Sequence, residues 1–83
     1  MIKTEQRLFT TLDLYLSSFL SLNGIPPNLE FKNGRVIFVF PISNNLNSLS
    51  LEFNSNVSVP VADFVVTIKT LRGQMLTMRE VRK

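Results

Sequence analysis

Residues 28–41 read NLEFKNGRVIFVFP, a stretch in which two apolar runs flank an Asn-Gly pair. Both residues of such a pair tolerate the positive φ angles of a type I′ turn, so the stretch predicts a β-hairpin with a two-residue loop. That loop sets the register, which places Lys32 opposite Arg35 and Leu29 opposite Phe38. The rest of the fold is predicted outward from this hairpin.

The second strand of the hairpin, RVIFVF at residues 35–40, is apolar on both of its faces. Ile37 and Val39 lie on the face where a half-buried strand carries polar side chains, so we expect this face to be covered. Three covers fit the sequence. A second copy of the chain could pair with or pack on the strand, residues 57–59 could add a third strand, or a helix over residues 46–53 could lie across it. The five apolar residues on the first face are Leu29, Phe31, Val36, Phe38 and Phe40.

Three helices are predicted around the hairpin. The stretch TTLDLYLSSFLSLNG has Thr11 as its N-cap and a stop at Asn23-Gly24, and Ser43 caps a short second helix. The third helix follows Pro60, and Gly73 within it predicts close packing against the hairpin or another helix. The apolar face of the first helix is Leu12, Tyr15, Leu16, Phe19, Leu20 and Leu22. The third helix carries an apolar seam of Val61, Phe64, Ile68, Leu71, Met75 and Met78 at alternating spacings of three and four.

Length and composition indicate a single small domain. The chain has 83 residues, of which 45% are hydrophobic and 18% charged, which predicts one folded core. We predict an α+β domain over residues 11–83 in the order α-β-β-α-α, with the hairpin packed against helices and the sheet extended by dimerisation. Residues 1–10 show no periodicity and are interpreted as a flexible N-terminal lead-in.

The residue inventory argues against an enzyme. Histidine and cysteine are absent, which excludes Ser-His-Asp and Cys-His catalysis and the usual zinc sites. The six carboxylates show no paired spacing, and no glycine-rich phosphate loop exists. We therefore predict no catalytic, metal or cofactor site. No apolar run reaches the length of a membrane span and no secretory signal is present, so we expect a cytoplasmic protein.

Basic residues gather toward the C-terminus of a chain whose formal net charge is +3. Two interpretations stay open: a solvated flank of the last helix, with cations favoured near a helix C-terminus, or a stripe that contacts the phosphates of a nucleic acid. The candidate phosphate-contacting residues are Lys69, Arg72, Arg79, Arg82 and Lys83.

Three segments together carry a family resemblance. With TTLDLYLSSFL, GRVIFVF and DFVVTIKTLRGQM in this order, the chain resembles a family of small bacterial and phage-associated proteins known as a domain of unknown function. The likeness covers most of residues 9–76. It implies the same order of elements and brings no activity or site residue with it.

The functional hypothesis is a non-enzymatic interaction or scaffold protein that forms a homodimer through its second strand and C-terminal helix. Four residues are predicted to contact the second copy of the chain or another partner: Ile37, Val39, Met75 and Met78. Two alternatives remain: a nucleic-acid-binding accessory protein that uses the basic stripe, and a small inhibitor or adaptor that binds another protein by β-addition.

Overall fold

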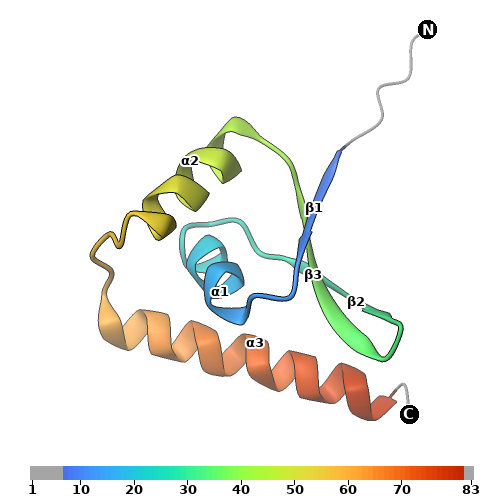
Figure 1. Ribbon diagram of the computed structural model, residues 1–83. Helices are drawn as coiled ribbons and strands as arrows, with labels where there is room; N and C mark the ends of the chain where they lie inside the picture. The colour runs from blue at the N-terminus through green and yellow to red at the C-terminus, as the bar shows by residue number, and fades with distance from the viewer. Residues whose placement is uncertain (1–6, 82–83) are drawn as a thin grey trace, which may run out of the picture.

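The computed structural model describes residues 7–81 and contains three strands and three helices in the order β1-α1-β2-β3-α2-α3 (Figure 1). The strands are β1 (Leu8–Thr11), β2 (Asn28–Lys32) and β3 (Arg35–Pro41). The helices are α1 (Leu14–Leu22), α2 (Asn44–Asn54) and α3 (Val61–Val81). The α+β class and the order of the five predicted elements are confirmed, with β1 as an addition.

The predicted hairpin is confirmed in its turn and in its register. Asn33 and Gly34 have φ angles of 52° and 76°, as a type I′ turn requires. Lys32 pairs with Arg35, and each earlier residue of β2 pairs with the predicted residue of β3. The face carrying Phe38 turns toward the helices and belongs to the core.

The N-terminal strand β1 corrects the prediction of a flexible lead-in over residues 1–10. Leu8–Thr11 pair antiparallel with β3, and the backbone N–H of Ile42 donates to the carbonyl of Arg7 at 3.0 Å. Residues 1–6 lie outside the described part of the chain. The strand order is β1-β3-β2, so β1 and β2 run parallel with β3 between them, which makes a split β-α-β unit around α1.

The position of β3 also explains how its second face is covered. Val39 lies between Thr10 of β1 and Asn28 of β2, and only 5% of it is exposed. Ile37 is half-buried. Neither alternative cover from within the chain is correct, because residues 57–59 form no strand and α2 packs its Leu46 into the core on the other side of the sheet.

Helix α1 occupies the centre of the molecule, with α2 and α3 on either side of it and the sheet beside it (Figure 1). Its N-cap is Asp13 rather than the predicted Thr11: Asp13 Oδ1 accepts from the backbone N–H groups of Tyr15 at 2.9 Å and Leu16 at 3.0 Å. Thr11 belongs to β1, and its Oγ1 accepts from the backbone N–H of Asp13 at 3.0 Å.

The buried surface of α1 differs from the predicted apolar face. Leu12 and Tyr15 are more than half exposed, whereas Ser17 and Ser18 are completely buried. Four consecutive buried residues cannot share one side of a helix, so neighbours surround α1 on most of its circumference. Small serine side chains let those neighbours approach closely.

The predicted N-cap of α2 and the predicted stop after α1 are confirmed. Ser43 Oγ accepts from the backbone N–H of Leu46 at 3.0 Å at the start of α2. Gly24 has a φ angle of 95° after α1, which is the left-handed stop that the Asn-Gly pair predicted. The residues that form the core cluster are Phe19, Leu20, Phe38, Phe40, Leu46, Leu49 and Leu71.

Candidate interaction surfaces

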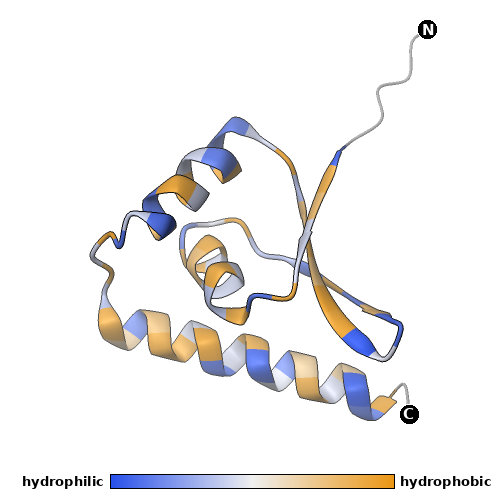
Figure 2. Cartoon of the chain, in the orientation of Figure 1, coloured by the Kyte–Doolittle hydropathy of each residue, from blue (hydrophilic) through white to orange (hydrophobic). Residues whose placement is uncertain are grey.

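The two sides of α3 differ in what covers them. The predicted inner seam, which we define as Phe64, Ile68, Leu71, Met75 and Met78, is buried or half-buried. Val61 was also predicted for this seam, but it is 72% exposed at the start of the helix. Figure 2 shows hydrophobic bands recurring along the whole of α3 between hydrophilic ones, so the helix carries more apolar residues than its inner seam uses.

A second line of residues runs along the exposed side of α3. We call it the outer seam, and it consists of Ala62, Val66, Lys69, Gly73 and Leu76. Its spacings of four, three, four and three match the spacing of an interhelical seam. Val66 is 61% exposed and Leu76 is 50% exposed. Sequence reasoning missed this seam, although its spacing could have been found in the sequence, because the inner seam is more hydrophobic.

Gly73 does not pack against the hairpin or another helix of this chain, which overturns the prediction made for it. A Cβ built at Gly73 would meet no atom within 4 Å apart from its chain neighbours and the backbone of its own helix. Beside it lies an open groove of about 590 Å³ along the second half of α3. The groove is lined by Gly73, Gln74, Thr77, Met78 and Val81.

The four residues predicted for a partner interface do not form one surface. Ile37 and Val39 lie on the outer face of the sheet, and Val39 is nearly buried there. Met75 packs against the core, while half-buried Met78 reaches the groove beside Gly73. Strand β3 cannot pair edge to edge with a partner, because β1 and β2 occupy both of its edges. The edge strands of the described sheet are β1 and β2.

The predicted basic stripe is exposed where the structure describes it. Lys69, Arg72 and Arg79 all lie at exposed positions of α3, and Arg82 and Lys83 lie outside the described residues. Arg79 faces the tip of the hairpin, where the chain brings two further cations, Lys32 and Arg35. From the sequence, these two residues were placed opposite each other beside the hairpin turn. Their proximity to α3 was not predicted.

Two adjoining open cavities lie at the hairpin tip, and we call them together the basic cleft. One lies between the hairpin and the end of β1, and the other lies between the hairpin and α3. The larger, of about 490 Å³, is lined by Thr10, Thr11, Leu12, Lys32, Asn33, Arg35 and Ile37. The smaller, of about 280 Å³, is lined by Leu12, Gly34, Arg35, Val36, Met75 and Arg79. Leu12 and Arg35 belong to both cavities. No carboxylate among the described residues lines either one.

Acidic residues gather at the other end of α3. Glu52 of α2 and Asp63 in the first turn of α3 line a shared depression together with Ser58 and Asn23. Helix α3 therefore leads from an acidic end, at the junction with α2, to a basic end at the hairpin tip. Among residues 7–81, no three His, Cys, Asp or Glu side chains are grouped to hold a metal ion. No helix in this range has the length and apolar character needed to cross a membrane.

The fold defines a small α+β domain built on a split β-α-β unit with two additional helices. Residues 6–77 match a family model described as a domain of unknown function (DUF5659), so the chain belongs to this family. The predicted resemblance to a domain of unknown function agrees with this match. No curated protein and no solved structure gave a match to the chain.

Proposed function

We propose that this protein is a small non-enzymatic interaction module that forms a homodimer through the outer seam of α3. The observation that carries the proposal is Gly73, a glycine in the interior of a helix and at an exposed position. Glycine at such a position costs about 1 kcal/mol relative to alanine, and the open space around it offers no compensation within the chain. A partner whose backbone approaches closely would supply that compensation.

The surroundings of Gly73 favour a helix as the partner. Val66 and Leu76 lie on either side of it along the outer seam and are 61% and 50% exposed, so a helix packed on Gly73 would cover apolar surface of both. The alternating spacings of four and three along the outer seam are those at which one helix packs against another.

A second copy of α3 in antiparallel orientation fits this seam. The last four residues of the seam are spaced symmetrically about position 71, so antiparallel pairing places Val66 against the partner's Leu76 and Lys69 against the partner's Gly73. The missing side chain of Gly73 leaves room for the lysine stem. This pairing is isologous, as a two-fold dimer requires.

Charge favours the antiparallel orientation over the parallel one. A parallel pair would align Asp63 with its copy and Arg79 with its copy, and would also oppose the two Lys69 ammonium groups. An antiparallel pair instead brings the acidic end of each α3 near the basic end of the other and opposes the two helix dipoles. Complementary potentials of this kind fix the orientation of a complex.

The expected dimer is weak and reversible. Burying the exposed parts of Val66 and Leu76 in both copies contributes about 1 kcal/mol or more per side chain. Association costs at least about 4 kcal/mol in lost translational and rotational freedom. These two contributions nearly offset each other, so we expect weak association, and the concentration series must extend from micromolar to about 1 mM.

Light scattering over that concentration range tests the proposal. We expect the mass to rise with concentration from 9.5 kDa toward twice this value. Leu76→Glu should abolish the rise, because it places two carboxylates in the apolar contact. Leu51→Glu is the matched control, since Leu51 is an exposed leucine of α2, 69% exposed and remote from the outer seam. A parent protein that stays monomeric at 1 mM, or equal effects of the two variants, would contradict the proposal.

The substitution Gly73→Ala distinguishes an effect on dimerisation from an effect on folding stability. The added methyl group has open space in the monomer, so the free energy of unfolding should rise by up to about 1 kcal/mol. The same methyl group holds two helices apart, so dimerisation should weaken. A variant that is more stable and dimerises as well as the parent would show that Gly73 is not a contact point.

The orientation can be tested by cross-linking, because the parent chain has no cysteine. Antiparallel packing predicts that an equimolar mixture of Val66→Cys and Leu76→Cys chains forms a mixed disulfide on mild oxidation. Parallel packing predicts that each variant cross-links efficiently with itself. Mass spectrometry distinguishes the two products.

The wider setting of the protein stays a prediction. A non-enzymatic role and a cytoplasmic location are predictions from the residues, and a bacterial or phage association is what the family resemblance implies. Binding of another protein by β-addition would have to use β1 or β2, the edge strands of the described sheet, in place of β3.

A further inference from the structure

We propose that the basic cleft at the hairpin tip binds the phosphate groups of a phosphodiester or phosphate ester. Three cationic side chains from three segments of the chain line it: Lys32 and Arg35 of the hairpin line the larger cavity, and Arg35 lines the smaller one together with Arg79 from the last turns of α3. This site differs from the stripe predicted along α3 alone, because the hairpin supplies two of its three charges. It does not depend on dimerisation.

Arg35 holds the central position in the cleft. It lines both cavities, so its guanidinium can reach a phosphate in either one, and a guanidinium matches the geometry of phosphate oxygens. Arg79 adds a second guanidinium from the far side of the smaller cavity. Arg72 lies two turns earlier on the same side of α3, about 10 Å along the helix axis, and would extend the line of positive charge.

The lining of the cleft is suited to an anion. Thr11 Oγ1 accepts a hydrogen bond from the backbone of Asp13, so its hydroxyl hydrogen can donate to a ligand. Leu12, exposed at 54% of its surface and shared by both cavities, places an apolar side chain beside Arg35. Apolar surroundings lower the local dielectric and strengthen an ion contact.

Neighbouring carboxylates are engaged or lie outside the cleft. Glu30 pairs with Lys32 across 3.5 Å, with 44% and 65% of the two side chains exposed. The Asp13 carboxylate accepts the backbone hydrogen bonds that cap α1. Lys32 is therefore the cation whose charge is already partly balanced, and Arg35 and Arg79 should contribute more to binding.

The size of the cleft limits the ligand. The larger cavity, about 490 Å³, falls in the range of small-ligand sites and can hold a phosphate with its sugar. It is too open to enclose a whole ligand, and the second cavity continues it toward α3. A single-stranded nucleic-acid backbone that crosses the cleft and a free phosphate ester are the two sources of this chemistry.

Binding of a fluorescent 12-nucleotide oligo(dT) by the full chain, measured by anisotropy at several salt concentrations, tests the site. We expect Arg35→Gln to weaken binding about 5- to 10-fold at low salt and to reduce the slope of log affinity against log salt by about 0.7. Glu30→Gln should strengthen binding, because it releases Lys32. Circular dichroism of each variant verifies that it is folded.

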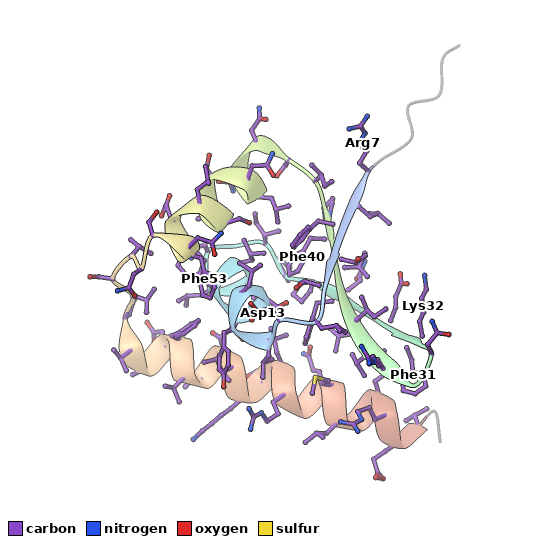
Figure 3. The ribbon with its side chains drawn as sticks, viewed as in Figure 1. Arg7, Asp13, Phe31, Lys32, Phe40 and Phe53 are labelled. Carbon is purple, nitrogen blue, oxygen red and sulfur yellow. The ribbon has the colours of Figure 1, made fainter. Side chains whose placement is uncertain are left out.

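Two controls remove the same single charge elsewhere. Arg7 lies at the end of the sheet opposite Lys32, as Figure 3 shows, so Arg7→Gln should leave affinity nearly unchanged. Lys69→Gln tests the stripe on α3. If either control weakens binding as much as Arg35→Gln, attraction is diffuse and the proposal fails.

Pyrophosphate distinguishes the two sources of phosphate. Displacement of the oligonucleotide by millimolar pyrophosphate, lost in Arg35→Gln, supports a site for phosphate groups on a nucleic-acid backbone. Binding of pyrophosphate alone, dependent on Arg35 and without binding of oligo(dT), assigns the site to a free phosphate compound. If neither probe binds the parent protein at low salt, the proposal is overturned.

Discussion

Helices α1 and α3 pack against each other, but they differ in how much of their surface the rest of the chain covers. In α1, nine residues long, the consecutive residues Ser17, Ser18, Phe19 and Leu20 are all buried. In α3, 21 residues long, only Leu71 is buried. Two serines are thus hidden while Val66 is 61% exposed, so position in the fold, rather than hydrophobicity alone, decides burial here.

The difference assigns separate roles to the two helices. Helix α1 lies at the centre of the core. Neighbouring elements pack on several of its sides, and they limit which side chains fit there. One side of helix α3 packs on the core, and the other side carries exposed apolar residues. Apolar residues and a glycine that the fold does not need are candidates for contact with a partner.

The largest expected effect comes from truncating an aliphatic side chain to alanine in each of the two helices. Leu20→Ala in α1 removes a fully buried side chain and should lower the free energy of unfolding by about 2–5 kcal/mol. Val66→Ala in α3 should change it by less than about 0.5 kcal/mol when the protein is dilute. Urea denaturation at low micromolar concentration measures both. Similar losses for the two variants would show that the outer seam is part of the fold.

The sequence predicted well those elements whose signals are local. Asn33-Gly34 defined the turn and hence the register of β2 with β3, because a two-residue loop permits only one pairing. Ser43 and Gly24 predicted a helix start and a helix stop, because a cap depends on a few neighbouring residues. The inner seam of α3 followed from its periodicity.

The missed features depend on contacts that are distant in the sequence. Strand β1 has four residues and is specified mainly by pairing with β3 about thirty residues later, where Phe9 meets Phe40 with ring centroids 6.2 Å apart. The β-propensity of four residues does not predict such a long-range pairing. The basic cleft escaped prediction for the same reason, since Arg35 and Arg79 become neighbours only when α3 returns to the hairpin.

A smaller effect concerns the start of α1, where the central helix leaves β1. Asp13→Ala removes the acceptor of two capping hydrogen bonds and should cost about 1 kcal/mol of unfolding free energy. Asp13→Asn keeps an acceptor and should cost little. Asp63→Ala in the first turn of α3 loses only interaction with the helix dipole, about 0.5 kcal/mol. Equal costs for Asp13→Ala and Asp13→Asn would mean that charge, not capping, matters.

The smallest effect distinguishes two adjacent buried serines in α1. Ser18 Oγ donates to the carbonyl of Leu14 at 2.8 Å, whereas Ser17 Oγ is buried without a hydrogen-bond partner among the described residues. A buried hydroxyl without a partner costs free energy, so Ser17→Ala should be neutral or stabilising by up to about 1 kcal/mol. Ser18→Ala gains the same helix propensity but loses a hydrogen bond, so it should be less stable than Ser17→Ala by about 1 kcal/mol. Paired urea denaturation curves measure this difference, and a Ser17→Ala variant that is the less stable of the two would indicate that the Ser17 hydroxyl has a partner in solution.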